Sequence, residues 1–548
     1  MATYYYAEGG GAANKEAATG GAYPAGCMSP ATCNSESAGF SPGDFCLASD
    51  EGGDIRTEMG VSCASGTSGN MITWGIKSGD SPILNGADVI TGWTLESGST
   101  WQATVTTRPQ QVFIDDTFGT RHPDLATVQG GSEYGWFWSS NVLYLYAPGD
   151  PDTEYTKVEA SQRELGLAVQ SDYITVDGIH ARYANRNGIG GQQAGDHVVV
   201  ENCLGEWNWY KGVGPESLSE ALYIDWTIQD CICRYNGVGG IGHGIVFEEG
   251  IIRRNECYEN GKYQPAGNSY DQEQYDWSFG IKIFELNDTE AGCEIYENVC
   301  HTNGRGEFQD AQGAGCGIWI DHATGTAEKP YLIHHNLVYD NMGNGIFIEI
   351  SSHCYVYGNV GWDNGNSAWQ EPANIVLDSR YDFKTENNLI YNNTFVGGYY
   401  GIKLATYAAT SECSVSDNII KNNIITGASV RAVYTIAGGD NDGVHGSGNL
   451  FSKNCFGAES TGFIEWEYTA CDTYDAYLSK ANGMENIQPD NNIELDPLFA
   501  DAGNDDYTLA ADSPCIGAGE NLGSPYHEAL MPSSTWPAGV VTGSQDDY

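Results

Sequence analysis

The chain has 548 residues and a formal charge of −49, with 71 glycines, 12% aromatic residues and only 24 lysines and arginines. Such acidity along the chain excludes nucleic acid as a partner, because nucleic-acid binding requires a basic patch. It also disfavours polyanionic glycans unless a bound cation reverses the local field, so we expect a neutral glycan as the partner.

The chain contains sixteen cysteines, which is unusual for a cytosolic protein and favours an oxidising compartment. Four of them lie in the glycine-rich N-terminal region, where we expect disulfides to stabilise a segment with little core: Cys27, Cys33, Cys46 and Cys63. No stretch of the sequence is long and apolar enough to span a membrane. The sequence opens without a hydrophobic leader, and we interpret the protein as secreted, with its signal peptide removed.

Short β-type runs separated by glycine and asparagine turns predict an all-β solenoid in five segments. Residues 1–60, rich in Gly, Ala, Ser and Cys, are expected to cap its open end, because exposed strand edges must be covered. The first coils follow over 61–104. Alternating runs with clustered aromatics predict an inserted β subdomain over 105–160, whose tryptophans form a small core or, alternatively, one wall of a sugar site. The main coils occupy 161–450, and C-terminal coils with a cap occupy 451–548.

Two strands recur in each coil between residues 161 and 450. One ends in Asn or Asp, and stacked asparagine side chains at this place predict a structural ladder of hydrogen bonds from coil to coil. The other opens with an apolar pair or Gly-Ile, at Gly244, Gly280, Gly317, Gly345, Asn374 and Gly401. The connections are too short for helical crossovers, so successive strands are expected to stack as coils of a parallel β-helix.

A column of acidic residues follows from counting along this second strand. Side chains alternate between the two faces of a strand, so the second and fourth residues after each opening face outward. The fourth positions are Glu248, Phe284, Asp321, Glu349, Asp378 and Ala405, and the second positions include Lys282, Trp319 and Phe347. Acids stacked at the strand spacing of about 4.8 Å repel one another, which indicates that the column serves chemistry or a cation.

Asp321 and Glu349 are the candidate catalytic pair. On adjacent coils their carboxyl groups are expected roughly 5 Å apart, in the range of about 5 to 5.5 Å that is typical of retaining glycosidases. One carboxylate would attack the anomeric carbon, while the other, its pKa raised by its neighbour, would protonate the leaving oxygen. Asp321 and Asp378, two coils and about 9.6 Å apart, are the weaker alternative, near the spacing of about 6.5 to 9.5 Å of inverting enzymes.

The residues around this pair are candidates for substrate binding: Trp319, Phe347, Lys282, Asp378, Glu248 and His322. An exposed Trp319 and Phe347 beside carboxylates would bind the apolar face of a sugar. Packing of Trp319 under a loop is an equally open alternative, and His322 is also expected as a hydrogen-bonding residue of a loop. No metal ligand is assigned among these residues in the leading interpretation.

The phrases Gly-Ile-Trp-Ile-Asp-His at 317–322 and Gly-Ile-Phe-Ile-Glu-Ile-Ser at 345–351 resemble the acid-bearing coils of the retaining β-xylosidase family of glycoside hydrolases. Proteins of that family are right-handed parallel β-helices with an inserted β-sandwich-like subdomain. The resemblance implies the same fold class here, with Asp321 as nucleophile and Glu349 as acid/base. It covers most of residues 60–450, and its coil motifs are shared with lyases, epimerases and adhesins.

Three functions are compatible with these observations. The first is a secreted retaining glycoside hydrolase that cleaves a neutral plant or algal polysaccharide or oligosaccharide. It would require no cofactor, hold at most a structural Ca²⁺, and bind neither nucleic acid nor membrane. The second is a polysaccharide lyase with Lys282 as base and Ca²⁺ held by Glu248 or by Asp321 and Glu349. The third is a non-catalytic glycan-binding adhesin or tailspike-like stalk, in which the acids are solvated surface or a calcium site.

Overall fold

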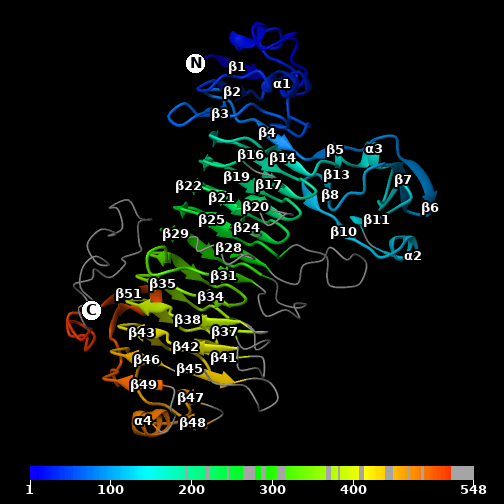
Figure 1. Cartoon of the computed structure of the whole chain (residues 1–548). Coiled ribbons are helices and arrows are strands. Elements are labelled where there is room, and N and C mark those ends of the chain that lie inside the picture. Colours follow the sequence, from blue (N-terminus) through cyan, green and yellow to red (C-terminus); the bar gives the residue numbers. More distant parts are fainter. Residues whose placement is uncertain are drawn as a thin grey trace. The chain divides into compact units, whose positions relative to one another are not determined.

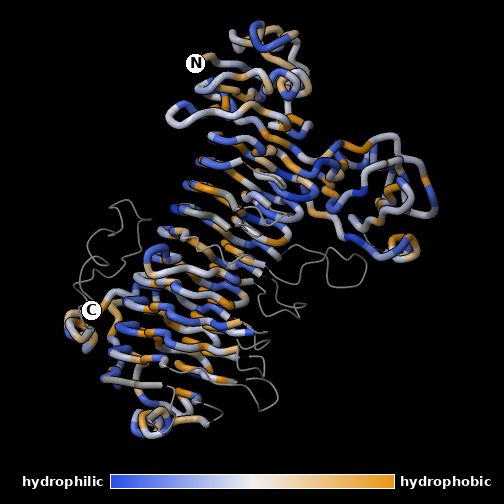
Figure 2. The backbone as a smooth tube through the Cα atoms, in the orientation of Figure 1, coloured by the Kyte–Doolittle hydropathy of each residue, from blue (hydrophilic) through white to orange (hydrophobic). Residues whose placement is uncertain are grey.

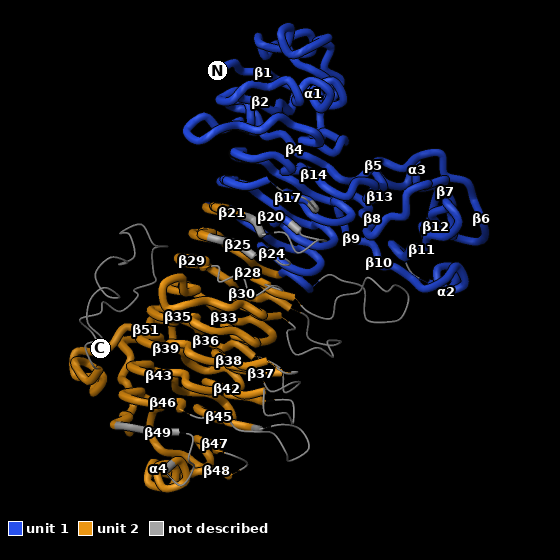
Figure 3. The backbone as a smooth tube through the Cα atoms, viewed as in Figure 1, with its two compact units in different colours: residues 1–219, 230–242, 260–275 blue, residues 220–229, 243–259, 276–548 orange. Residues whose placement is uncertain are grey.

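The structure is a computed structural model (Figure 1), and it divides into two compact units (Figure 3). The first unit comprises Met1–Ser219, Asp230–Gly242 and Asn260–Tyr275, and the second comprises Glu220–Gln229, His243–Glu259 and Asp276–Tyr548. The residues that the structure describes are 1–131, 133–192, 195–216, 222–242, 246–262, 278–284, 292–304, 315–365, 372–380, 383–406, 413–437, 448–466, 469–482 and 487–519.

The coils of the first unit form three parallel sheets. One contains β1 (Thr3–Tyr6), β2 (Phe45–Ala48), β3 (Ile72–Ile76), β15 (Ile174–Asp177) and β18 (Val199–Glu201). A second contains β14 (Leu165–Ala168), β17 (Asn187–Gln192), β20 (Lys211–Glu216) and β24 (Gly239–Gly242), and a third contains β4 (Ile83–Asn85), β16 (His180–Arg182), β19 (Leu204–Glu206) and β23 (Ile232–Arg234). The helices η1 (Ala17–Thr19) and α1 (Pro30–Ser37) separate β1 from β2. Since β1 and β2 pair in parallel with one another and β2 with β3, residues 1–60 supply coil strands as well as covering segments.

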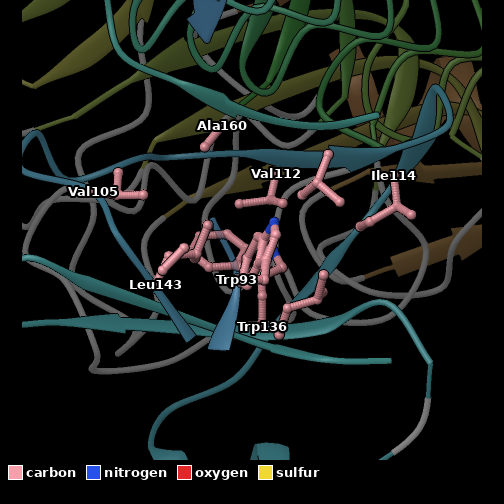
Figure 4. Packing of buried hydrophobic residues seen from close by; sticks show 10 residues of the cluster. Trp93, Val105, Val112, Ile114, Trp136, Leu143 and Ala160 are labelled. Atoms are coloured by element: carbon pink, nitrogen blue, oxygen red, sulfur yellow. The ribbon is translucent and has the colours of Figure 1, made fainter. Parts of the chain in front are cut away.

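Two further sheets, mainly antiparallel, form the inserted subdomain of the first unit. One contains β5 (Ala87–Val89), β13 (Val158–Ser161), β8 (Val112–Ile114) and β9 (Thr117–Phe118). The other contains β10 (Thr120–Arg121), β11 (Gly135–Ser139), β12 (Val142–Tyr146), β7 (Thr100–Thr104) and β6 (Thr94–Ser97), with the helices α2 (Leu125–Gln129) and α3 (Pro151–Glu154). Trp93 and Trp136 pack against Leu143 in its core (Figure 4). The subdomain strands thus begin at Ala87, earlier than the expected boundary at 105, and the tryptophans form its core.

The second unit repeats the three-sheet coil. Its first sheet contains β22 (Thr227–Gln229), β26 (Gly250–Arg253), β29 (Cys293–Tyr296), β32 (Tyr331–His334), β35 (Cys354–Tyr357), β39 (Leu389–Tyr391), β43 (Ile419–Lys421), β46 (Asn449–Ser452) and β49 (Ile487–Asp490). Its second sheet contains β28 (Phe279–Phe284), β31 (Cys316–Asp321), β34 (Ile346–Glu349), β37 (Ala373–Ser379), β41 (Tyr400–Thr406), β45 (Arg431–Ala437), β47 (Ile464–Trp466) and β48 (Thr469–Cys471). Its third sheet contains β27 (Glu256–Tyr258), β30 (Val299–His301), β33 (Leu337–Tyr339), β36 (Val360–Trp362), β40 (Thr394–Val396) and β44 (Ile424–Thr426).

Smaller elements complete the second unit. Three short strand pairs are β21 (Leu222–Ile224) with β25 (Val246–Glu248), β38 (Lys384–Glu386) with β42 (Ser414–Ser416), and β50 (Phe499–Asp501) with β51 (Asp506–Leu509). The helices are α4 (Tyr474–Asn482) and η2 (Ala502–Asn504). Residues 520–548 of the expected terminal cap lie outside the described residues. The fold is a right-handed parallel β-helix with an inserted β subdomain, as predicted.

The coil cores are built from the apolar residues that alternate along each strand, and Figure 2 shows hydrophobic and hydrophilic residues interspersed along the coils. In β31, Ile318 and Ile320 are fully buried, and they lie opposite Ile346 and Ile348 of β34. Because one strand buries every second side chain, the residues between them are directed to the outer face of the sheet. The outer face of this sheet bears the candidate catalytic acids.

A ladder of asparagines, buried except for the partly buried Asn492, runs through the second unit, as predicted. Its members are Asn255, Asn298, Asn336, Asn359, Asn393, Asn423, Asn454 and Asn492. In a typical step, Asn359 Nδ2 donates to Asn393 Oδ1 and to the carbonyl oxygen of Ile333, each at 2.9 Å, while Asn359 Oδ1 accepts from the main-chain and side-chain nitrogens of Asn336. We call this set the asparagine ladder. Each amide supplies both donors and acceptors, so the ladder satisfies itself.

The predicted disulfides are not present in this structure, and fifteen of the sixteen cysteines are buried. Of the N-terminal four, Cys33 and Cys46 lie with their sulfur atoms 3.2 Å apart. In the second unit, Cys257 pairs in register with Cys300 on the neighbouring coil, as a small apolar core residue. Among the described residues, no helix has the length and hydropathy needed to cross a bilayer.

Candidate active site

The candidate acids lie on three neighbouring strands of the second unit. In the strand register, Asp321 of β31 is opposite Glu349 of β34, and Glu349 is opposite Asp378 of β37. This pairing confirms, for these three residues, the register predicted from the repeat. Neighbouring strands of a sheet are about 4.8 Å apart. We call Asp321, Glu349 and Asp378 the acid column. Glu349 is its middle member and has a carboxyl group on either side.

Glu248 does not extend the acid column as the sequence predicted. It ends β25, which pairs with β21 in a two-stranded sheet of its own. The side chain of Glu248 and the opening residue Gly244 lie outside the described residues. Two short strands, β24 and β25, follow one another here, and β24 is the one that belongs to the long parallel sheet. Counting residues from an apolar opening cannot show which of two such strands joins that sheet.

Lys282 neutralises the first acid. Its Nζ lies 2.7 Å from Asp321 Oδ2, and both side chains are largely buried. The same ammonium group lies 3.1 Å from the centroid of the Trp319 ring, which adds a cation–π contact. Burying a charge is costly unless it is paired, so Lys282 holds Asp321 in place as a carboxylate with a compensating charge.

Each carboxyl oxygen of Glu349 has a nitrogen partner, a hydrogen-bond donor at Oε2 and an ion-pair partner at Oε1. Trp319 Nε1 donates to Oε2 at 3.0 Å, and the Nε atom of Arg380 lies 2.8 Å from Oε1. Burial raises the pKa of Glu349 to about 8, with the Asp321 and Asp378 carboxylates adding to the rise and Arg380 and Lys282 opposing it. Glu349 is therefore a carboxyl group that retains its proton near neutral pH.

Asp378 has a different environment from Glu349. Arg380 Nε donates to Asp378 Oδ2 at 2.9 Å and Arg380 Nη2 contacts the same oxygen, whereas Oδ1 has no hydrogen-bond partner among the described residues. The side chain is 1% exposed. Burial raises its pKa to about 6, although the neighbouring Arg380 and Lys403 charges oppose the rise. Asp378 thus titrates at a lower pH than Glu349.

Trp319 and Phe347 are buried and do not offer the exposed aromatic surface that the sequence predicted. They are 6% and 1% exposed, and their rings stack with centroids 5.3 Å apart. Both belong to an apolar cluster with Val376, Tyr400 and Tyr434. The outer face of this sheet is covered rather than solvated, so these aromatics support the acids and are not a sugar platform.

His322 follows Asp321 in a left-handed conformation, with φ of 58°. Its main-chain N–H donates to the Glu349 carbonyl oxygen at 2.9 Å. Its ring packs edge-on against Phe383 at 4.3 Å between centroids and lies 6.2 Å from the Phe284 ring. These contacts fit the alternative of a loop residue that makes structural contacts.

Arg380 and Lys403 are charged residues of this site to which the sequence analysis assigned no role. Arg380 comes two residues after Asp378, so the period of two directs both side chains to the same face, and counting two residues further would have found it. Lys403 lies opposite Val376 in the register and is 3% exposed. Its ammonium is 5.7 Å from the Tyr434 ring centroid. Two buried lysines, Lys282 of β28 and Lys403 of β41, thus lie on the strands before and after the three acid-bearing strands, and the partly buried Arg380 lies beside the last acid.

Within the part of the chain that the structure describes, no three His, Cys, Asp or Glu side chains are arranged to hold a metal ion. The positive charge that faces the acid column comes from side chains instead, as Lys282 pairs with Asp321 and Arg380 pairs with Glu349 and Asp378. The arrangement places a protonated carboxyl group beside an ion-paired carboxylate, which is the pairing that acid-assisted nucleophilic displacement requires.

No protein-family model matches the chain. One curated relative, the uncharacterized protein YwoF of Bacillus subtilis (strain 168), is 29% identical over 214 residues, which amount to 37% of this chain and 41% of YwoF. The chain therefore matches about two fifths of the length of that relative.

Three solved structures resemble the whole chain. The complex of XylC with xylose gives a TM-score of 0.52 at 14% identity and covers 89% of this chain and 83% of XylC. A glycoside hydrolase gives a TM-score of 0.48 at 9% identity, with 93% and 99% covered, and pectate lyase Pel9A gives 0.40 at 13%, with 96% and 94% covered. At these identities the shared property is the fold, a parallel β-helix found in carbohydrate-active proteins, and the chemistry has to be derived from the site.

Proposed function

We propose that the protein is a glycoside hydrolase that cleaves a neutral glycan with retention of configuration at the anomeric carbon. The observation that supports this proposal is the pair Asp321 and Glu349, which are opposite one another on adjacent strands. One member is ion-paired as a carboxylate, and the other has a pKa raised to about 8. A carboxyl group of raised pKa beside one that is held in an ion pair is the arrangement of an acid and nucleophile pair.

The reaction would proceed in two displacements. In the first, Asp321 forms a bond to the anomeric carbon while Glu349 gives its proton to the glycosidic oxygen, and the C–O bond to the leaving group breaks. In the second, Glu349 takes a proton from water, the water oxygen bonds to the anomeric carbon, and the bond to Asp321 breaks. Each step leaves Glu349 ready for the next, because its proton is lost in the first and regained in the second.

The spacing of the acid column favours retention over inversion. Asp321 and Glu349 are one strand apart, or about 4.8 Å, close to the carboxyl separation of about 5 to 5.5 Å in retaining enzymes. Asp321 and Asp378 are two strands apart, which would suit inversion, but the only described partners of Asp378 Oδ2 belong to Arg380. Arg380 also contacts Glu349, but the pKa of Asp378 is raised only to about 6, against about 8 for Glu349, so Asp378 is the weaker choice of acid.

The lyase alternative is less well supported by the site. It uses Lys282 as the base, and the Nζ of Lys282 lies 2.7 Å from Asp321 in a buried ion pair. A base has to be free to accept a proton from the sugar, whereas this amine is engaged with a carboxylate. The adhesin alternative offers no reason for the raised pKa of Glu349, since a binding surface does not need a proton donor.

The test is turnover of a panel of neutral polysaccharides and aryl glycosides, starting with aryl xylosides because of the family resemblance. We expect Glu349→Gln to lower kcat by about 10²- to 10⁴-fold, as loss of a general acid does, and Asp321→Asn to abolish turnover. Glu465→Gln is the matched control, because Glu465 of β47 is on the same sheet and is also paired with an arginine, Arg431 of β45. Full activity of either acid variant, or a first-formed product of inverted configuration by NMR, would contradict the proposal.

A further inference from the structure

We propose that Arg380 is a positioning residue for the reaction: its guanidinium ties the carboxyl group of Glu349 to that of Asp378 and fixes the proton-donating group in place. This inference rests on the proposed function, in which Glu349 is the acid. It also changes the expected role of Asp378, which becomes the anchor of Arg380 rather than a residue that binds substrate.

The geometry of the guanidinium carries the inference. Its Nε lies 2.8 Å from Glu349 Oε1 and 2.9 Å from Asp378 Oδ2, so one N–H faces two carboxyl groups on adjacent strands. Nη2 also contacts Asp378 Oδ2. The guanidinium carbon lies 5.8 Å from the centroid of the Phe347 ring, which is buried in the apolar cluster. A planar, multiply held guanidinium has little freedom to move, so it restricts the orientation of Glu349 as well.

Arginine is suited to this place because of the charges around Glu349. Asp321 of β31 and Asp378 of β37 raise the pKa of Glu349, and Lys282 of β28 and Arg380 lower it. The charge of Glu349 also contributes to raising the pKa of the Cys316 thiol of β31, and the charge of Lys403 of β41 lowers the pKa of Asp378. Without Arg380, two carboxylates would face Glu349 with Lys282 as the nearest compensating charge.

The sign of the effect follows from these charges. Arg380 favours the ionised form of Glu349, so its removal raises the pKa of Glu349 above its present value of about 8. A carboxyl group that holds its proton more tightly is a poorer acid for the first displacement, in which it must give a proton to the glycosidic oxygen. Arg380 therefore keeps Glu349 able to give up its proton.

The experiment compares Arg380→Met with Arg380→Lys. In Arg380→Met we expect the basic limb of the kcat/KM profile to move up by about 1 to 3 pH units, the usual effect of one nearby charge, and kcat to fall by about 100-fold through loss of orientation. Arg380→Lys keeps the charge without the planar fork, so the basic limb should stay near the wild-type position while kcat stays low. This split distinguishes the charge of Arg380 from its geometry.

Arg431→Met is the matched control. Arg431 is also paired with a carboxylate on this sheet, since its Nη2 lies 3.1 Å from Glu465 Oε2. Arg431→Met therefore makes the same substitution in a comparable ion pair, but the carboxylate partner, Glu465, is outside the acid column. The pH profile of Arg431→Met should coincide with that of the wild type.

A second measurement does not depend on turnover. The infrared C=O stretch of a protonated carboxyl group, recorded against pH and corrected with Glu349→Gln, gives the titration of Glu349 in the unliganded protein. It should move to higher pH in Arg380→Met. If it moves while the wild type turns over no glycan, the electrostatic effect of Arg380 on Glu349 is confirmed, but the proposed function falls and the catalytic role of Arg380 falls with it. If Glu349 titrates in Arg380→Met as in the wild type, or if Arg380→Met retains full kcat, the inference is overturned.

Discussion

The asparagine ladder and the acid column are both stacks of polar side chains on the coils of the second unit, but they are satisfied in opposite ways. Each asparagine in the ladder donates to the next and accepts from the previous one, as Asn336, Asn359 and Asn393 do. The carboxyl groups of Asp321, Glu349 and Asp378 can only accept when ionised, so they cannot satisfy one another. They depend on donors from outside the column.

Because of this difference, the asparagine ladder contributes to stability, whereas the acid column is a candidate for chemical reactivity. In the ladder every buried amide has its partners, which adds cohesion between coils and leaves no reactive group. In the acid column, Lys282 and Arg380 supply the missing charge, and one carboxyl group, Glu349, keeps a raised pKa. The same stacking geometry thus gives a structural support where the groups are complementary and a candidate reactive site where they are not.

The largest expected effect comes from changing one ladder residue into an acid. Asn359→Asp removes the side-chain donor to Asn393 Oδ1 and to the Ile333 oxygen, so that Asn393 Oδ1 keeps the Asn359 main-chain N–H but loses its second donor, and it places two acceptors together. We expect it to lower the free energy of unfolding by about 3 kcal/mol or more, since each buried unsatisfied group costs about 1 to 3 kcal/mol. Urea denaturation measures the change.

The matched control for this variant is Asn202→Ala, because Asn202 bonds Asp177 at an exposed position outside the ladder. Its effect should stay within roughly 1 to 2 kcal/mol, below that of Asn359→Asp, because Asn202 has a φ of 55°, in the left-handed region that is strained for alanine. The folded fraction of Asn359→Asp should keep wild-type turnover, since the ladder and the acids are separate columns. A stability equal to that of the wild type would show that the ladder adds no cohesion.

A second prediction concerns pH and the acid column. Glu349 has a pKa raised to about 8 in the folded protein, against roughly 4.3 in an unfolded chain, so between these pH values the folded state binds a proton that the unfolded state has lost. The contribution of Glu349 therefore makes stability fall as pH rises through this window. Glu349→Gln should show a smaller fall in the urea midpoint between pH 5 and pH 8.

Asp378 remains in that variant and acts in the same direction at lower pH, because its pKa is raised to about 6. The difference between Glu349→Gln and the wild type should therefore be widest above pH 6. Parallel stability curves for the two proteins across the window would contradict a protonated Glu349.

The smallest expected effect comes from removing one donor of the acid column. Trp319→Phe loses the indole N–H that donates to Glu349 Oε2 at 3.0 Å but keeps a ring beneath the Lys282 ammonium. We expect kcat to fall by about tenfold, which corresponds to about 1.4 kcal/mol, and stability to change little. Trp362→Phe, a buried tryptophan in a different apolar cluster, is the control. Unchanged kcat in Trp319→Phe would mean that Arg380 alone orients Glu349.

Much of the site was predictable because it repeats with the coil. The period of two in each strand and the regular spacing of the openings placed Asp321, Glu349 and Asp378 in one register, and the strand pairing confirms it. The asparagine ladder was predictable for the same reason. Glu248 was misplaced because two short strands, β24 and β25, follow each other where the count assumed one.

The amino-acid sequence alone determined the β-helix, the asparagine ladder and the opposition of Asp321 and Glu349, because all three follow from periodicities along one strand and from the length of one coil. Only the tertiary structure decided that Trp319 and Phe347 are buried, that Lys282 pairs with Asp321, and that Arg380 joins Glu349 to Asp378. These contacts run diagonally between coils, through long side chains. Their partners and their burial depend on which atoms of neighbouring coils surround them, and no spacing along the chain encodes that.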